Sequence, residues 1–209
     1  MTTLNMHLTG LRPDQSLITQ WIKPGSKVLD IGCGDGALLQ YLMTHHGVEG
    51  YGLELDPTHV SQSIRSGINV IQTDAEAGLP RYFADHSFDV VIMTQSLQVM
   101  HRPDWLLGEI LRIAEEGIVT FPNFGFWKHR LQLGLYGRMP VSETLPEQWY
   151  DTSNIHLYTL QDFEDLCQKK SIQIRQRKFI NQDHNTSLGT RLFPNLFAEI
   201  ALYRLSKSL

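Results

Sequence analysis

The chain of 209 residues carries 18 Lys and Arg against 22 Asp and Glu, a formal charge of −4, and 42% of its residues are hydrophobic. This length suits one domain with a substantial core, and the composition excludes a disordered chain. A weakly acidic chain has no global attraction for polyanions, so we expect no nucleic-acid partner. No apolar run approaches about 18 residues, which predicts no membrane partner. The two cysteines, Cys33 and Cys167, fit a reducing, cytoplasmic location.

Helix-like and strand-like segments alternate along the first half of the chain. Short buried strands are predicted at residues 27–31, 50–55, 69–72, 88–93 and 117–121. Helices are predicted at residues 13–22, 37–46 and 103–113, and another begins at Asp56-Pro57 and ends at Gly67, with Val60 and Ile64 facing inward. This alternation implies right-handed crossovers and a parallel sheet covered on both faces. The predicted class is α/β, doubly wound and Rossmann-like.

The second half of the chain departs from this pattern. Residues 122–158 are rich in Gly, Pro and aromatic residues and too long for a plain connection, so we expect an insertion or lid after the fifth strand. A helix is predicted at 160–169 and strands at 172–180 and 198–205. Residues 1–12 have no clear period and are predicted to be a loose tail on a single domain that spans 1–209.

A glycine-rich turn, Asp30–Gly36 (DIGCGDG), lies between the first strand and its helix. Glycines there let the backbone approach a ligand, and this position in an open α/β sheet is a binding crevice. The turn also matches the weak dinucleotide pattern G-x-G-x-x-A. A dinucleotide, however, places its pyrophosphate at the start of this helix, where the carboxylates of Asp30 and Asp35 would repel it. The turn therefore favours S-adenosylmethionine, which presents an ammonium and a sulfonium.

Further predicted contacts follow from this cofactor. The side chain of Asp30 would accept a hydrogen bond from the ammonium, directly or through water. Glu54 ends the second strand, where its carboxylate would accept the ribose hydroxyls, and Asp74 follows the third strand, where it would accept the adenine amino group. Asp56 is predicted to be a helix cap in preference to a ligand contact, and Asp74 taken alone is also compatible with a turn residue. The full predicted set of cofactor contacts is Asp30, Gly32, Cys33, Gly34, Gly36, Glu54, Leu55, Asp74, Ala75, Thr94 and Gln95.

The first half resembles the class I S-adenosylmethionine-dependent methyltransferases. The resemblance lies in VLDIGCGDG (28–36), GLELD (52–56), TDAEAGLP (73–80) and SFDVVIM (87–93). It implies a seven-stranded sheet, and it places Thr94, Gln95 and Ser96 beside the methionine end of the cofactor.

The second half is similar to the methionine-biosynthesis protein MetW family. The similarity lies in TQSLQ (94–98), VTFPNFGFWKHR (119–130), GRMPVSETLPEQWYDTSNIH (137–156) and DFEDLC (162–167). Membership implies a cytoplasmic bacterial protein that acts in methionine synthesis alongside homoserine O-acetyltransferase or O-succinyltransferase.

The fold does not by itself imply that a methyl group is transferred. Three functions stay open: a protein that acts with or regulates the acyltransferase, a methyltransferase for a small-molecule acceptor, and a non-catalytic S-adenosylmethionine sensor. A base is needed only where the acceptor loses a proton. Candidates are His156 and Tyr158, followed by His101 and His129, although each has a simpler structural interpretation. Arg130 and Arg138 are candidates to bind an acceptor carboxylate, and the nine histidines form no metal-binding pattern.

Overall fold

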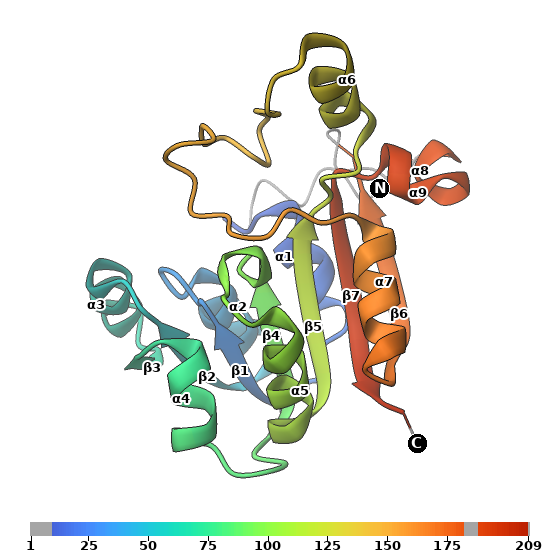
Figure 1. Ribbon diagram of the computed structural model, residues 1–209. Coiled ribbons are helices and arrows are strands. Elements are labelled where there is room, and N and C mark those ends of the chain that lie inside the picture. Colours follow the sequence, from blue (N-terminus) through green and yellow to red (C-terminus); the bar gives the residue numbers. More distant parts are fainter. Residues whose placement is uncertain (1–9, 182–187, 209) are drawn as a thin grey trace.

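A seven-stranded sheet forms the centre of the computed structural model, which describes residues 10–181 and 188–208 (Figure 1). The strand order is β3-β2-β1-β4-β5-β7-β6, in which β7 alone runs antiparallel to both of its neighbours. The strands are β1 (Lys27–Ile31), β2 (Glu49–Glu54), β3 (Asn69–Gln72), β4 (Phe88–Thr94), β5 (Ala114–Pro122), β6 (Ile172–Ile180) and β7 (Ile200–Lys207).

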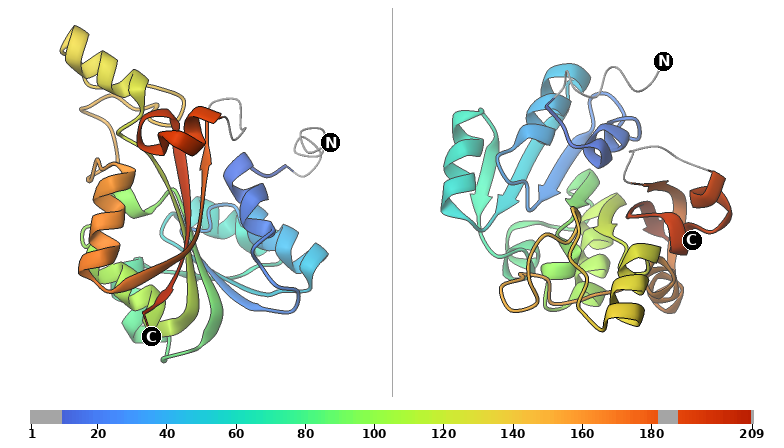
Figure 2. Two further views of the ribbon diagram at one scale, coloured as in Figure 1. Left: turned by 90° about the vertical axis from the view of Figure 1, so that its right-hand side faces the viewer. Right: turned by 90° about the horizontal axis from the view of Figure 1, so that it is seen from above.

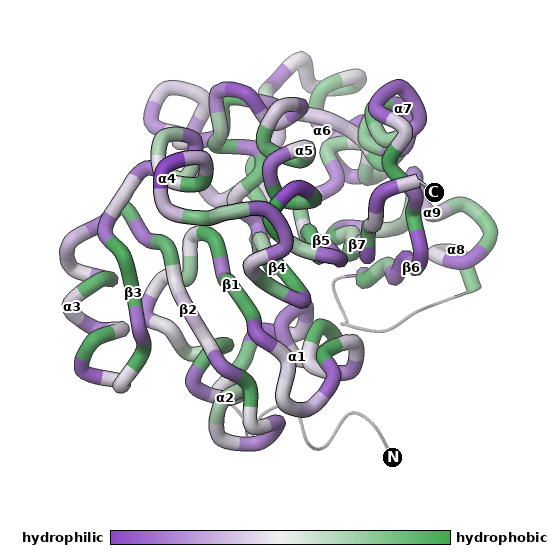
Figure 3. The backbone as a smooth tube through the Cα atoms, turned by 90° about the horizontal axis from the view of Figure 1, so that it is seen from below, coloured by the Kyte–Doolittle hydropathy of each residue, from purple (hydrophilic) through white to green (hydrophobic). Residues whose placement is uncertain are grey.

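Helices cover both faces of this sheet, because the strands are hydrophobic on both sides. In β4, Val91 and Met93 pack into one apolar cluster while Val90 and Ile92 pack into the other, as the two-residue period of a strand requires. The first cluster includes α4 (Ala75–Tyr82), α5 (Pro103–Ile113) and α7 (Leu160–Lys169). The second includes α1 (Pro13–Thr19) and α2 (Ala37–His46). Figure 3 shows hydrophobic residues along the central strands β1 and β4.

Side-chain caps set the starts of several helices. The side chain of Asp56 accepts hydrogen bonds from Thr58 N (2.6 Å) and His59 N (3.3 Å) and caps α3 (Pro57–Arg65). Thr159 and Asp162 form a reciprocal capping box at the start of α7. Asp56 is therefore a helix cap, which confirms the prediction from the sequence.

The segment between β5 and α7 stands beyond the carboxyl end of β5 (Figure 1). It contains α6 (Trp127–Tyr136), which the sequence analysis did not predict. Figure 2 shows the segment from above, over the half of the molecule that holds α5 and α7. The remaining helices missed from the sequence are α4, α8 (Leu188–Leu192), α9 (Pro194–Phe197) and the 3-10 turn η2 (Leu97–Val99).

Two further expectations were wrong. Ile64 does not face inward: it is 60% exposed, and Ser63 is the buried neighbour of Val60 on α3. Ser63 faces inward because its Oγ donates a hydrogen bond to Gly34 O at 2.8 Å. The predicted loose tail also ends too late, because Leu11 is buried and Arg12 forms the N-cap position of α1. Residues 1–9 lie outside the described part of the chain. Within the described residues, no helix has the length and apolar character of a membrane span.

Candidate functional site

A cavity of about 650 Å³ opens at the carboxyl edge of the parallel strands. Its position follows from the topology. Strands β2 and β3 are added on one side of β1, and strands β4 and β5 on the other, so the strand order reverses at β1 and leaves a crevice at its carboxyl end. Nine of the eleven predicted cofactor residues line it: Gly32, Cys33, Gly34, Glu54, Leu55, Asp74, Ala75, Thr94 and Gln95. The other two, Asp30 in β1 and Gly36 at the N-cap of α2, do not line it.

The glycine-rich turn forms one wall of this cavity and is held against β2. Gly32 N and Cys33 N both donate hydrogen bonds to Leu53 O, at 2.8 and 3.1 Å. Gly32 has φ +71°, and a Cβ atom there would lie 2.8 Å from Ser96 Oγ. The turn thus brings bare backbone to the cavity at a place where a side chain would collide with the loop after β4.

Glu54 occupies the adjacent wall and organises it. Its Oε2 accepts a hydrogen bond from Gly34 N (2.8 Å), and its Oε1 accepts from Leu55 N (2.8 Å) and Asp56 N (3.0 Å). A carboxylate offers about four acceptor positions. These bonds therefore leave about one position, on Oε2, for a ligand hydroxyl, fewer than the two-hydroxyl interaction that the sequence predicts.

Asp30 is buried next to this turn, with 1% of its surface exposed. Its Oδ1 has no hydrogen-bond partner among the described residues. Burial, opposed by the Arg12 charge, raises the pKa of the Asp30 carboxyl to about 7. Burial thus favours the protonated form of this carboxyl, and a cation placed beside it would favour the charged form instead.

Asp74 has two structural roles at once. Its Oδ1 accepts hydrogen bonds from Glu76 N (2.7 Å) and Ala77 N (3.3 Å), which cap α4, and the residue also lines the cavity. Its Oδ2 is not used by this cap. Asp74 is thus a capping residue that retains an acceptor beside the cavity.

A buried polar group at the cavity was missed by the sequence analysis. Asp14, with 0% exposure, accepts hydrogen bonds from Arg12, Gln95 and Thr120, and Arg12 lines the cavity. The only local signal is the Arg-Pro-Asp start of a helix, which reads as a capping pattern. Ser96, which the resemblance places beside the methionine end of the cofactor, also lines the cavity. The other lining residues that were not predicted as contacts are Gln15, Ile31, Asp35, Leu53, His59, Thr73, Glu76, Val99, Met100, His101 and Ser153.

The two leading candidates for a base lie elsewhere. His156 and Tyr158 line a separate, mostly apolar cavity of about 320 Å³ between η2 and α7. His156 Nε2 and the Tyr158 hydroxyl are buried without a partner in the described structure, and burial raises the pKa of Tyr158. The chain turns away from the cofactor cavity after Ser153, because Ile155 N and His156 N both donate to Gln98 O.

Of the secondary candidates, His101 lines the cofactor cavity, and its Nδ1 lies 3.4 Å from Glu76 Oε2. His129 is buried in α6, where its Nε2 is 3.0 Å from Ser142 Oγ and burial lowers its pKa. The structure thus brings to the cavity only one of the four residues considered as a base.

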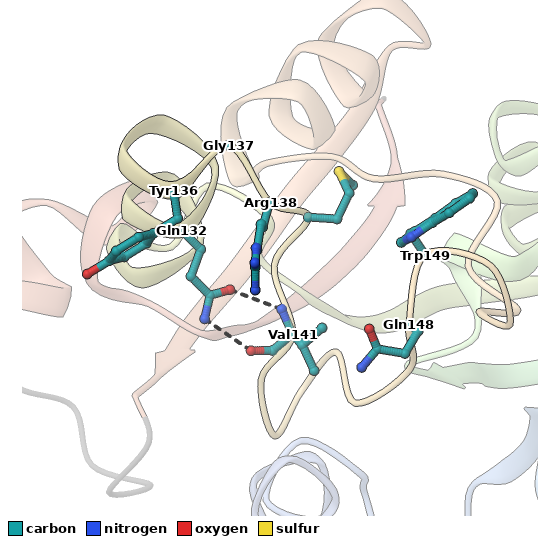
Figure 4. A pocket seen from close by; sticks show the side chains of 8 residues that line it. Gln132, Tyr136, Gly137, Arg138, Val141, Gln148 and Trp149 are labelled. Atoms are coloured by element: carbon teal, nitrogen blue, oxygen red, sulfur yellow. Dashed lines mark hydrogen bonds between the residues drawn. The ribbon is translucent and has the colours of Figure 1, made fainter.

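A second large cavity, of about 770 Å³, lies within the insertion (Figure 4). Gln132 of α6 fixes its shape by exchanging two hydrogen bonds with the backbone of Val141, and Arg138 and Trp149 also line it. Arg130 does not join Arg138 there, because it donates hydrogen bonds to Gly125 O and Asn195 O. The pair predicted to bind an acceptor carboxylate is therefore not assembled.

Metal and thiol chemistry find no support in the described part of the chain. It contains no group of three His, Cys, Asp or Glu residues placed to hold a metal ion. Burial, together with the Asp30 charge, raises the pKa of the Cys33 thiol to about 12. A Cβ atom on Gly52 would lie 2.5 Å from Cys33 Sγ, so the thiol packs closely onto β2.

Comparisons with known proteins agree with this architecture. A methyltransferase from Mesorhizobium loti, described as S-adenosylmethionine dependent, superimposes with a TM-score of 0.68 at 14% identity, covering 95% of this chain and 100% of that one. A second such methyltransferase, from Archaeoglobus fulgidus, gives a TM-score of 0.66 at 16% identity, covering 92% and 94%. The fold is that of a class I methyltransferase.

The family is shown by sequence. The model of the family "Methionine biosynthesis protein MetW" matches residues 12–205. The "Bifunctional methionine biosynthesis protein MetXA/MetW" of Rhodopirellula baltica is 32% identical over 92% of this chain. The chain belongs to the MetW family, and it spans 32% of the length of that relative.

Proposed function

We propose that the chain binds S-adenosylmethionine in the cavity at the carboxyl edge and acts in methionine biosynthesis together with a homoserine O-acyltransferase. The observation that carries the cofactor assignment is Asp30, a buried carboxyl with an unpartnered oxygen beside a glycine-rich turn. An ammonium group would supply the missing donor and the missing positive charge.

The rest of the cavity suits the same ligand. Glu54 retains an acceptor for a ribose hydroxyl, and Asp74 retains one for an adenine amino group, with Ala75 next to it. A dinucleotide fits less well, because a pyrophosphate at the start of α2 would meet Asp30 and Asp35. The two solved structures compared above are themselves described as S-adenosylmethionine-dependent methyltransferases.

The partner is proposed from the fused relative. In Rhodopirellula baltica one polypeptide carries both the MetXA and the MetW designations. Fusion suits two functions that operate side by side, and it supports an acyltransferase partner for a chain that holds the MetW part alone. We expect this pair to work in the cytoplasm.

We assign the cofactor a regulatory role in this pair. The two leading candidate bases lie in a different cavity, which leaves His101 as the one candidate base in the lining of this site, as far as the structure describes the chain. S-adenosylmethionine is made from methionine, and its binding would report the state of the pathway to the partner enzyme.

The test uses the purified chain with homoserine O-acetyltransferase. We expect the two proteins to co-purify and the acetyltransferase rate to change when the chain is added, with a further change on adding S-adenosylmethionine. The Asp30→Ala variant should lose the cofactor effect and keep the association. Labelled methyl donor in the same mixture should stay unreacted; label in a small molecule would instead assign a methyltransferase activity. Failure to associate and an unchanged rate would overturn the partnership.

A further inference from the structure

Charge is distributed unevenly around the cofactor cavity. Asp35, Glu54, Asp74 and Glu76 all line it, whereas Arg12 is the one Lys or Arg side chain in its lining, as far as the structure describes the chain. S-adenosylmethionine carries a single anionic group, the carboxylate of its amino-acid end. On the basis of the proposed function, we infer that Arg12 binds this carboxylate and that Asp14 is the residue that positions Arg12.

Arg12 is oriented by a buried partner. Its Nε lies 3.2 Å from Asp14 Oδ1 and its Nη2 lies 3.3 Å from Asp14 Oδ2. Half of the Arg12 side chain is exposed, while that of Asp14 is 1% exposed. These contacts use two of the five N–H groups of the guanidinium, so three can donate to a ligand. The planar guanidinium can donate two parallel hydrogen bonds, so it suits a carboxylate better than the ammonium of a lysine side chain would.

Asp14 accepts hydrogen bonds from two further side chains. Gln95 Nε2, in the loop after β4, and Thr120 Oγ1, in β5, each donate to Asp14 Oδ2 at 3.1 Å. Gln95 has φ +50°, a conformation that is unusual for a residue other than glycine and that is often found at binding sites. The network therefore fixes Arg12 to the same loop that borders the methionine end of the proposed ligand.

The arrangement can bind both ends of an amino acid. Asp30 would meet the ammonium and Arg12 the carboxylate, and the Arg12 charge lowers the pKa of Asp30 against the effect of burial, so the two groups are within electrostatic reach.

A simpler interpretation is that Arg12 only neutralises the buried Asp14. The two interpretations differ in ligand selectivity. A structural ion pair would change the stability of the protein and the affinity for every adenosyl ligand alike, whereas a carboxylate-binding arginine matters only for ligands that carry the carboxylate.

The experiment compares S-adenosylhomocysteine with its decarboxylated analogue, which keeps the ammonium and lacks the carboxylate, by calorimetric titration. We expect the parent protein to bind S-adenosylhomocysteine about 10- to 100-fold more tightly, in the range of a charge-assisted hydrogen bond pair. Arg12→Ala should remove this preference while changing the affinity for the analogue less than about threefold. Arg138→Ala, a matched arginine in the insertion cavity, should leave both affinities unchanged.

Asp14→Asn should reduce the same preference, because an amide cannot accept from Arg12 on one side and from Gln95 and Thr120 on the other. If this variant fails to fold, Thr120→Val gives the same readout, a smaller loss of preference with the fold retained. Equal binding of both ligands by the parent, or an equal loss of both in Arg12→Ala, would overturn the inference and leave the proposed cofactor standing. Absence of binding to either ligand would overturn both.

Discussion

Glu54 Oε2, at the end of β2, accepts a hydrogen bond from the backbone N–H of Gly34, in the turn after β1, at 2.8 Å. Through its other oxygen the same carboxylate holds the backbone of Leu55 and Asp56. One side chain therefore joins two walls of the cofactor cavity and keeps the glycine-rich turn in place before a ligand arrives. Such preorganisation lowers the entropic cost of binding.

Replacing Glu54 tests this arrangement. Glu54→Ala removes the hold on Gly34 together with the ribose acceptor, and we expect it to weaken S-adenosylhomocysteine binding about 10- to 100-fold in a calorimetric titration. Glu49→Ala, at the other end of the same strand and outside the cavity lining, is the control and should bind like the parent. Equal affinities for the two variants would show that Glu54 takes no part.

Asp30 gives a prediction about pH. Its pKa rises from 3.8 in the unfolded chain to about 7 in the folded one, so the folded protein holds the extra proton between these values. The free energy of unfolding should therefore fall as pH rises from about 4 to 7 and then level off, by up to about 4 kcal/mol from this group. Asp30→Asn should lack this component. The check is urea unfolding of both proteins between pH 4.5 and 8; parallel curves would contradict the assignment.

The two roles of Asp74 can be separated. Asparagine is as good a helix cap as aspartate, so Asp74→Asn should change the free energy of unfolding by less than about 0.5 kcal/mol. If the oxygen left free by the cap accepts the adenine amino group, the amide nitrogen placed there will not, and S-adenosylhomocysteine affinity should fall about 10-fold. Asp56→Asn alters the cap of α3, outside the cavity lining, and should leave affinity unchanged. An unchanged affinity of Asp74→Asn for S-adenosylhomocysteine would show that Asp74 acts only as a helix cap.

Helix α2 offers a matched pair of glycines, Gly36 at its N-cap and Gly47 at its C-cap, both with positive φ. A Cβ atom on Gly36 would lie 2.9 Å from both Ser63 Oγ and Ile68 Cγ1, whereas one on Gly47 would meet nothing within 4 Å. We expect Gly47→Ala to cost about 1 kcal/mol of unfolding free energy and Gly36→Ala about 1–3 kcal/mol more. Urea unfolding measures both. Similar losses would mean that the turn yields to the added methyl group.

Much of the fold is predictable because its signals are local. The residues of β1, β3, α2, α5, α7 and β6 were predicted with the observed bounds. Local residues mark the helix boundaries: Gly36 and Gly47 flank α2, Pro103 begins α5, and Thr159 caps α7. Helix α6 was not predicted because Leu131, Leu133 and Leu135 alternate at a spacing of two and are all exposed. Helix α4 was not predicted because it contains Gly78 and Pro80; the Asp74 cap and the burial of Leu79 stabilise it.

The site divides in the same way. Glu54 and Asp74 are predictable because each follows a strand, and the carboxyl ends of parallel strands meet at one edge. Asp14 is not predictable, since its partners Gln95 and Thr120 lie 81 and 106 residues away in the sequence. His156 was misplaced for a related reason: only the hydrogen bonds to Gln98 O show that the chain leaves the cavity before reaching it.

Asp30 and the turn beside it are expected to bind an adenosyl ligand with a free ammonium. The decisive measurement is a calorimetric titration of the purified chain with S-adenosylhomocysteine. We expect saturable binding at one site, largely lost in Asp30→Ala. Absence of binding at millimolar ligand, with Asp30→Ala indistinguishable from the parent, would contradict it.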